Sequence, residues 1–258
     1  MFPRRISALL YSIMKRYKPH ITILGATLLV LVASAVYVLI SFDINHILPE
    51  NFVLRKMSEV DVSGIDVSHH QGNIDWDKVH KVKPGLDFVY VKCTEGKNYV
   101  DPAFVKNVRG AAAQGYKVGA YHYFRMTSSA RDQFRNFKAQ MDKVHLDLIP
   151  MVDVETNDKK PHKELQDSLQ VLLDLLEDAY GKKPMIYGTN RSYNNFCAPE
   201  FNHYPLYIGR YGNSKPVVTG PSHYTIWQYT KDARIPGIHK PVDMCRMHPD
   251  YQQEFIVL

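Results

Sequence analysis

Cysteine is scarce in this chain, and the few cysteines show no metal-site spacing. The 258 residues include Cys93, Cys197 and Cys245, but no C-x-x-C pair. An odd number of cysteines leaves at least one thiol without a partner inside the chain, so a disulfide framework is excluded. Because structural zinc sites commonly use closely spaced cysteines, we expect no structural zinc. The chain also has no internal repeat and no low-complexity segment, which excludes a repeat architecture.

Acidic residues are absent from the first 42 positions. Five of the six net positive charges come from that region, from Arg4, Arg5, Lys15, Arg16 and Lys18. The rest of the chain therefore carries a net charge of only about +1. With 45% hydrophobic and 22% charged residues, the composition is ordinary for a globular protein. We expect no nucleic-acid partner, because the charge balance offers no basic surface.

Residues 21–42 contain no charged residue (ITILGATLLVLVASAVYVLISF). At ~1.5 Å rise per residue, a helix of this length spans the ~30 Å core of a bilayer. Basic residues precede this segment and acidic residues follow it, so the positive-inside rule places the N-terminus in the cytoplasm. A cleavable signal peptide ending at Ala33-Ser34-Ala35 is the alternative. We expect a retained anchor, because the apolar run continues to Ile40.

These patterns divide the chain into four parts. We expect a basic cytoplasmic segment at 1–20, a transmembrane signal anchor at 21–42, a linker at 43–60 and a folded domain at 61–258. The protein would then be membrane-anchored, with its folded domain in the periplasm or at the cell surface.

Short apolar runs recur after residue 60, and helical patterns separate the early ones. The runs lie at residues 62–68, 88–93, 117–124, 149–158, 184–188, 205–210, 224–229 and 242–244, and the helical patterns at 103–114, 128–145 and 163–180. Alternating strands and helices predict a parallel sheet, and eight strands in about 200 residues predict that the sheet closes into a barrel. The last three strands have few helical residues between them.

Two carboxylates, Asp153 and Glu155, lie near the end of the fourth run. Alternation along a strand puts both on one face, with ~7 Å of backbone between them. Because like charges on a half-buried face repel, one of them is expected to hold its proton near neutral pH. Glycosidic bond cleavage requires such a pair, one acid to protonate the leaving oxygen and one carboxylate opposite. The alternative is a strand end whose acids form ion pairs with Lys or Arg.

Further polar residues lie at the expected strand ends, where barrel enzymes gather their chemistry: Asp66, Glu95, His122, Asp153, Glu155, Gln228 and Asp243. His69, His70 and His122 raise the question of a metal site. Adjacent residues on a strand end face opposite ways, so one site seldom uses both His69 and His70. We therefore expect neither a metal nor a cofactor.

Six blocks of residues occur in an order that resembles the N-acetylmuramidases (lysozymes) of glycoside hydrolase family 25. They are GIDVSHHQG at 64–72, KCTEG at 92–96, GAYHYF at 119–124, MVDVE at 151–155, WQY at 227–229 and VD at 242–243. The resemblance covers about residues 61–250. It implies a TIM-like (β/α)5(β)3 barrel, here preceded by the N-terminal transmembrane helix. It also implies cleavage of the β-1,4 bond from N-acetylmuramic acid to N-acetylglucosamine in bacterial peptidoglycan.

The resemblance assigns roles to four acids. Glu155 matches the general acid, and Asp153 matches the carboxylate that stabilises the transition state or orients the substrate's acetamido group. Asp66 and Asp243 match two further acids of the site. Asp66 as a loop acid that caps nearby amides is the alternative. Cys245 stands where the family often has Asn, so we expect a substrate contact to be missing there.

Substrate-binding candidates surround these acids: Tyr123, Glu95, His122, Tyr187, Trp227 and Tyr229. Aromatic rings beyond the strand ends can stack on sugar faces, although such rings more often fill the barrel. An ion pair with Lys92 is the alternative role for Glu95.

We expect a peptidoglycan hydrolase that remodels the cell wall, with glycan strands as its partner and a monomeric catalytic domain. A wall-binding protein without hydrolysis is one alternative, although binding alone does not need four costly acids. A chitinase-like, substrate-assisted hydrolase would need an acid two residues before Asp153, where Met151 stands. A metal-dependent deacetylase using the histidines is the last alternative.

Overall fold

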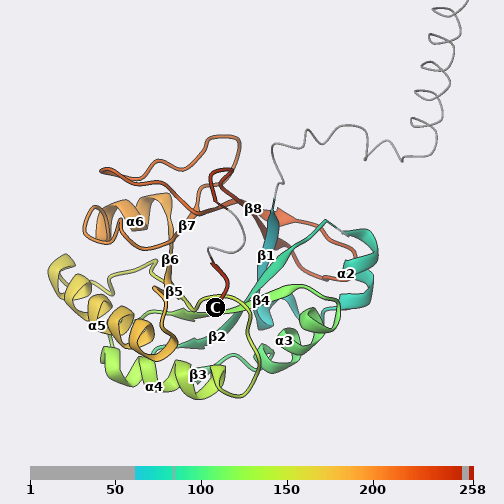
Figure 1. Ribbon diagram of the computed structural model, residues 1–258, viewed down its shortest axis with the longest axis horizontal. Helices are drawn as coiled ribbons and strands as arrows, with labels where there is room; N and C mark the ends of the chain where they lie inside the picture. The colour runs from blue at the N-terminus through green and yellow to red at the C-terminus, as the bar shows by residue number, and fades with distance from the viewer. Residues whose placement is uncertain (1–61, 84, 252–255) are drawn as a thin grey trace, which may run out of the picture. The chain divides into compact units, whose positions relative to one another are not determined.

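The computed structural model describes residues 62–83, 85–251 and 256–258, and these form a closed β-barrel with helices on its outside (Figure 1). The described strands are β1 (Ser63–Val67), β2 (Phe88–Glu95), β3 (Tyr99–Val100), β4 (Lys117–Tyr123), β5 (Met151–Asp153), β6 (Met185–Thr189), β7 (Leu206–Gly209), β8 (Ile226–Ala233) and β9 (Val242–Met247). The described helices are η1 (His69–Gln71), α2 (Trp76–Val82), α3 (Phe104–Ala113), α4 (Ala130–Met141), α5 (His162–Tyr180) and α6 (Asn190–Phe196).

Eight strands make up the barrel wall, in the order β1-β9-β8-β7-β6-β5-β4-β2. β2 also pairs with β1, which closes the sheet, and the short β3 adds to the far edge of β2 as an antiparallel partner. The strands that the apolar runs predicted are therefore confirmed in position. β3 was not predicted, because a two-residue strand has no periodicity to read.

The expected fold class requires a correction in the direction of one strand. Seven barrel strands run parallel to one another: β1, β2 and β4 to β8. The eighth, β9, runs antiparallel to its neighbours β8 and β1. The structure is thus a closed eight-stranded β-barrel and not the all-parallel TIM-like barrel that was expected. The reason is the connection: only residues 234–241 join β8 to β9, and parallel neighbours need a crossover of a dozen or more residues.

The expected transmembrane helix is not among the helices of the described residues. In the part of the chain that the structure describes, no helix combines the length and the apolar character that a membrane span needs. The predicted anchor at residues 21–42, together with segments 1–20 and 43–60, lies outside the described residues.

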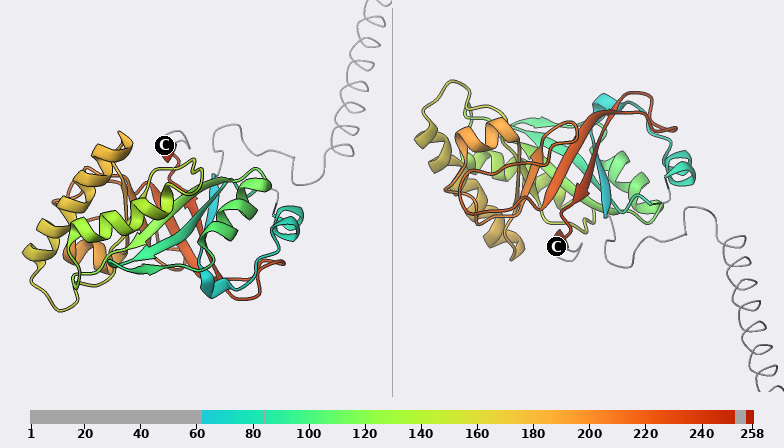
Figure 2. Two further views of the ribbon diagram at one scale, coloured as in Figure 1. Left: turned by 90° about the horizontal axis from the view of Figure 1, so that it is seen from below. Right: turned by 90° about the horizontal axis from the view of Figure 1, so that it is seen from above.

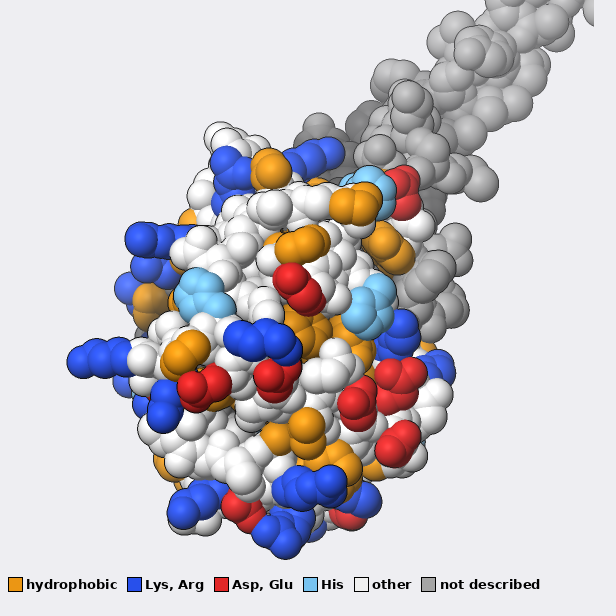
Figure 3. Space-filling model, turned by 90° about the vertical axis from the view of Figure 1, so that its left-hand side faces the viewer, with side chains coloured by type: hydrophobic (Ala, Val, Ile, Leu, Met, Phe, Trp, Pro, Cys, Tyr) orange, Lys and Arg blue, Asp and Glu red, His pale blue; other side chains and the backbone are white. Residues whose placement is uncertain are grey.

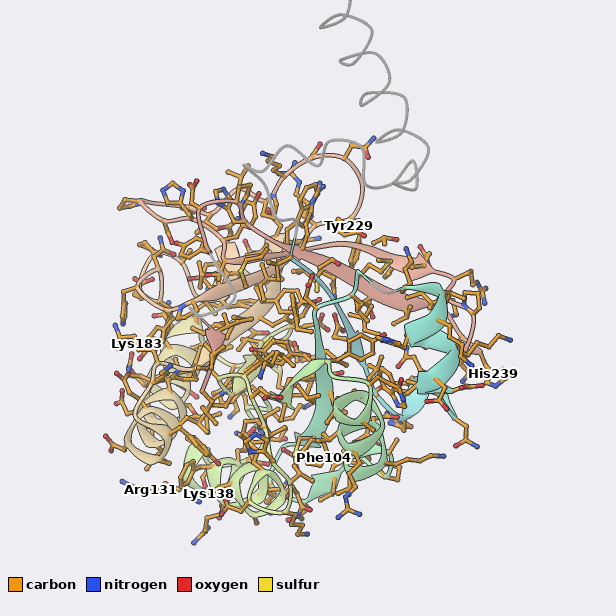
Figure 4. The ribbon with its side chains drawn as sticks, turned by 45° about the vertical axis from the view of Figure 1, so that its right-hand side comes forward. Phe104, Arg131, Lys138, Lys183, Tyr229 and His239 are labelled. Atoms are coloured by element: carbon orange, nitrogen blue, oxygen red, sulfur yellow. The ribbon has the colours of Figure 1, made fainter. Side chains whose placement is uncertain are left out.

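Alternation along the strands separates two apolar layers. One set of side chains, including Phe88, Tyr90, Tyr207 and Cys245, fills the inside of the barrel. The other set points outward and packs against the helices. On β2, for example, the outward-facing Val89 and Val91 alternate in sequence with the inward-facing Phe88 and Tyr90. In Figure 4, Phe104 of α3 belongs to this outer layer, whereas Arg131 and Lys138 lie on the outer side of α4.

Glycines make room for the large rings inside the barrel. A Cβ added to Gly64 would lie 2.3 Å from the Phe88 ring, and one added to Gly119 would lie 2.4 Å from the Tyr90 ring. Neither distance is tolerated between carbon atoms, and a packed core cannot shift these rings cheaply. Strand residues without side chains are therefore required opposite the two aromatic rings.

The helices cover the strands of the first part of the barrel, and β8 and β9 lie on the opposite side (Figure 2). The predicted helices at 103–114, 128–145 and 163–180 are confirmed as α3, α4 and α5. On the face over α5 and α6, acidic and basic side chains are interspersed (Figure 3). α2 and α6 were not predicted, since seven residues give too short a pattern for helical periodicity.

The end of the barrel away from the strand carboxyl ends is closed by the C-terminal residues. The amide of Ile149 donates to the carbonyl of Ile256 at 2.8 Å, and that of Leu258 donates to the carbonyl of Asp147 at 2.7 Å. The Tyr90 hydroxyl also donates to the carbonyl of Ile149 at 3.1 Å. This closed, apolar end leaves the opposite end of the barrel as the place for a site.

We predict that Gly119→Ala destabilises the barrel. The added methyl group overlaps the Tyr90 ring, and overpacking of this kind typically costs about 1–3 kcal/mol. The free energy of unfolding, measured in urea by circular dichroism, should fall by that amount. The exposed Ser214→Ala should change it by less than about 0.5 kcal/mol. Equal unfolding midpoints for the two variants would contradict this packing.

Candidate active site

Four acids meet in one cavity at the open end of the barrel. The cavity has a volume of about 170 Å³ and is lined by Asp66, Tyr121, Met151, Asp153, Glu155, Tyr187, Tyr211, Gln228 and Asp243. Asp66 and Asp153 lie at or near the carboxyl ends of parallel strands. Asp243 reaches the same place from the amino end of β9, because that strand is antiparallel. The four acids selected from the sequence are thus brought together.

Asp66 and Asp243 stand directly opposite each other on neighbouring strands. Cβ atoms of such pairs are ~4.5–5.5 Å apart, so two negative charges here repel strongly. Burial raises the pKa of Asp66 to about 6, although hydrogen bonds from Gln228 and Tyr207 favour its ionised form. Burial, with the charge of Asp66, raises the pKa of Asp243 to about 8. At neutral pH the pair therefore carries about one negative charge, which resides mainly on Asp66, and retains one proton, mainly on Asp243.

Asp153 is the most enclosed acid of the cavity, with 8% of its surface exposed. Burial raises its pKa well above the ordinary value, and the charge of Glu155 adds to the effect, while Lys92 opposes it. Its Oδ1 atom is buried without a hydrogen-bond partner among the described residues. An unsatisfied buried acceptor costs about 1–3 kcal/mol, so this oxygen is primed to accept a hydrogen bond from a ligand.

Glu155 lies two residues farther along the chain and is exposed at the mouth of the cavity. Burial of its carboxyl group raises its pKa, while the Tyr187 hydroxyl and the Lys92 ammonium lower it. Asp153 and Glu155 line the same cavity, as strand alternation predicted. Because the acids interact, their protons belong to the cluster and not to single residues.

Gln228 joins the acids to the aromatic wall of the cavity. Its Nε2 donates to Asp66 Oδ2 at 2.8 Å, and its Oε1 accepts from the hydroxyls of Tyr187 at 2.8 Å and Tyr211 at 3.2 Å. The Tyr207 hydroxyl also donates to Asp66 Oδ2, at 2.8 Å. These bonds hold the Asp66 carboxylate in one orientation. Gln228 was expected at a strand end but was not predicted to be a site residue, and neither was Tyr207 or Tyr211.

Gly209 gives the network the space that it needs. A Cβ at this position would lie 2.9 Å from Tyr187 Oη and 3.0 Å from Gln228 Oε1. Both atoms take part in the hydrogen bond between these side chains, so a larger residue at 209 would displace one of them.

Two of the predicted substrate-binding residues are buried away from the cavity. His122 is fully buried, with Thr94 Oγ1 2.7 Å from its Nδ1 and Gln133 Oε1 3.0 Å from its Nε2. Burial lowers the pKa of His122 to about 4, so the ring is neutral. Trp227 is 1% exposed, and its indole N–H donates to the carbonyl of Arg210 at 2.6 Å. Both side chains alternate with inward-facing neighbours and therefore point out of the barrel.

Tyr187 lines the cavity as predicted for a substrate contact, and Tyr123 lies beside it, in register with Asp153. Tyr229 lies on β8 (Figure 4), is partly buried, and has its hydroxyl 3.8 Å from Met244 Sδ. Cys245 is fully buried inside the barrel, where it cannot reach a substrate in the cavity.

Glu95 belongs to a chain of ion pairs beside the cavity. It contacts Lys92 at 2.9 Å and Arg125 at 3.8 Å, and Arg125 contacts Asp158 at 3.1 Å. Glu95 does not line the cavity, so the ion-pair alternative describes its position better than a direct substrate contact.

We predict that Asp243→Asn stabilises the protein at high pH. The native pKa of about 8 exceeds the ordinary 3.8, so the native state loses stability as pH rises between these values. The free energy that corresponds to this pKa shift is reduced because Asp243 is partly exposed. We therefore expect the variant to be more stable than the parent by about 1–3 kcal/mol at pH 8 and equally stable near pH 4. Urea unfolding at both pH values measures this. The exposed Asp178→Asn should show no such pH dependence, and equal curves for both variants would contradict the prediction.

Comparison with known proteins supports what the geometry suggests. The model of glycosyl hydrolases family 25 matches residues 65–238. The Escherichia coli (strain K12) protein YegX is 35% identical over 197 residues, which cover 75% of this chain and 72% of YegX. Lysozyme M1 of Streptomyces globisporus is 30% identical over 199 residues, covering 70% of this chain and 66% of that enzyme.

A solved structure gives the same result. A family 25 glycosyl hydrolase from Bacillus anthracis superimposes with a TM-score of 0.68 at 29% identity, over 78% of this chain and 93% of that one. The predicted resemblance and the predicted class of enzyme, a glycoside hydrolase, are therefore confirmed. Because a family match extends across residues 65–238 and the relatives share most of the barrel, this chain belongs to glycosyl hydrolases family 25.

Proposed function

We propose that this protein is a muramidase, which hydrolyses the β-1,4 bond between N-acetylmuramic acid and N-acetylglucosamine in peptidoglycan. Family membership and the likeness to lysozymes support the reaction and its substrate. The observation that carries the proposal is the convergence of Asp66, Asp153, Glu155 and Asp243 in one cavity open to solvent. Alternatives that need no acid cluster do not account for this arrangement.

Glu155 is the general acid in this proposal. It is the exposed acid of the cluster, so a glycosidic oxygen at the cavity mouth can reach its carboxyl group. Burial raises its pKa, which favours the protonated form that the reaction requires. Proton transfer from Glu155 to the leaving oxygen breaks the bond between the two sugars and leaves positive charge on one of them. A water molecule then adds to the anomeric carbon of that sugar, and its proton passes to the Glu155 carboxylate, which restores the acid.

The other acids act on the sugar that is left with positive charge. Asp153 Oδ1, which has no partner among the described residues, accepts the acetamido N–H of the substrate and orients that group. The ionised Asp66, held by Gln228 and Tyr207, stabilises the positive charge that develops at the ring. Asp243 keeps its proton and so reduces the repulsion that would raise the pKa of Asp66 further.

We also infer that the barrel works outside the cytoplasm as a monomer. Peptidoglycan is an extracytoplasmic polymer, so its hydrolase must reach that compartment. A single chain contributes all the acids of the cavity, so the site is complete without a second copy. Protease accessibility in intact cells and sedimentation of the purified protein test the two inferences.

We predict that Glu155→Gln lowers the rate of peptidoglycan hydrolysis by about 10²–10⁴-fold, because the amide has no proton to donate. The measurement is the release of new reducing ends at muramic acid. The exposed Glu200→Gln should keep the parent rate. A Glu155→Gln rate within tenfold of the parent, with an unchanged circular dichroism spectrum, would refute the role of Glu155. Peptidoglycan binding by the parent without any release would favour the wall-binding alternative.

We predict a bell-shaped dependence of kcat/KM on pH, because kcat/KM reports the ionisation of groups in the free enzyme. Activity should fall below about pH 6, where Asp66 gains a proton, and at alkaline pH, where Glu155 loses the proton that it donates and Asp243, with a pKa of about 8, ionises as well. Gln228→Leu removes a hydrogen bond that lowers the pKa of Asp66, so its acidic limb should move to higher pH. The alkaline limb should move less. A profile that is flat between pH 5 and 9, or the same in both proteins, would contradict these roles.

A further inference from the structure

Three aromatic rings form an exposed group beside the open end of the barrel. Tyr99, on β3, is 40% exposed, and the His69 side chain is 33% exposed. The ring centroids of His69 and Tyr99 are 6.1 Å apart, and those of His69 and the exposed His70 are 4.0 Å apart. We call Tyr99, His69 and His70 the rim platform. Neither the four acids nor the cavity lining includes any of these residues.

A buried carboxylate holds the rim platform in place. Asp101 is 2% exposed, and its Oδ2 accepts from the backbone N–H of His69 at 3.1 Å and lies 2.7 Å from His69 Nδ1. The Tyr99 hydroxyl is 3.2 Å from the same Nδ1. With Nδ1 engaged, the exposed ring offers Nε2, which no described residue binds. A side chain fixed in this way loses little entropy when it meets a ligand.

Lys92 connects the rim platform to the catalytic cavity. Its ammonium lies 5.5 Å from the centroid of the Tyr99 ring and 5.1 Å from that of the Tyr123 ring. Tyr123 stands in register with Asp153 across β4 and β5. The largely buried Lys92 therefore contacts both the Tyr99 ring of the rim platform and the Tyr123 ring next to the acids. These residues lie on the side of the barrel where β3 extends β2 (Figure 1).

The cavity is too small to enclose a glycan strand. Clefts that enclose a whole small ligand measure ~300–1,000 Å³, and this cavity measures about 170 Å³. A glycan strand is a polymer, so sugars beside the cleaved bond must lie outside the cavity. A sugar ring has an apolar C–H face, which suits the Tyr99 ring, and polar hydroxyl and amide groups, which can hydrogen-bond with His69 Nε2.

We propose that the rim platform is a distal sugar-binding site, which takes an N-acetylhexosamine residue of the glycan strand away from the bond that is cleaved. This proposal rests on the muramidase function proposed above. It names Tyr99 as the stacking ring and His69 as the hydrogen-bonding group that Asp101 orients. The site makes the enzyme favour long glycan strands over short ones.

The test compares kcat/KM on purified long glycan strands with kcat/KM on a tetrasaccharide of the same repeat. In Tyr99→Ala, the ratio of the two values should fall about 3- to 10-fold, which is the range for one aromatic contact. His69→Ala should lower the ratio in the same direction. Val100→Ala is the matched control, because Val100 is the next residue on β3, is 37% exposed and faces the other way. Its ratio should equal that of the parent.

A binding measurement separates the two proposals. The Glu155→Gln protein should bind long strands without cutting them, and Tyr99→Ala in that background should raise Kd by the same factor. If the parent releases no reducing ends, the proposed function fails, and the binding arm still decides the platform. An unchanged ratio and Kd in Tyr99→Ala, or an equal loss on long and short substrates, would overturn the rim platform.

Discussion

The repulsion between Asp66 and Asp243 is the constraint around which the site is arranged. Barrel closure places them opposite each other on β1 and β9, and neither can move without breaking the sheet. Gln228 and Tyr207 stabilise the charge on Asp66, so the proton stays on Asp243. Gln228 must in turn be held in one orientation. The hydroxyls of Tyr187 and Tyr211 do this by hydrogen bonds to its Oε1, and Gly209 leaves the space that this arrangement needs.

The two ends of the barrel contribute in opposite ways to stability. Rings such as Phe88 and Tyr90 fill the closed end, and glycines opposite them allow close packing. At the open end, acids with raised pKa values and an unsatisfied oxygen on Asp153 reduce the stability of the native state. The apolar end offsets this cost. Such a division is typical of enzymes, whose sites are less stable than the scaffolds that carry them.

Much of this arrangement was accessible from the sequence, and the rest depended on three-dimensional facts that local patterns do not contain. Apolar runs located the strands of the barrel, and family motifs selected the acids that line the cavity. His122 and Trp227 were selected for their residue type. Each directly neighbours a strand residue that lines the cavity, Tyr121 and Gln228 respectively, so strand alternation makes both face outward. The hydrogen bond from Tyr207 to Asp66 spans 141 residues and leaves no sequence signal. The direction of β9 depended on an eight-residue connection whose length was not weighed.

The closing strands have a consequence for the order of synthesis. Asp66 emerges from the ribosome long before its partner Asp243, and the residues that pair with 147–149, Ile256 and Leu258, follow later still. A nascent or truncated chain that stops before β9 lacks both a sealed barrel and one of its four acids. Hydrolytic competence therefore arrives only after β9 has been synthesised, so chains that stop before β9 are harmless to the wall.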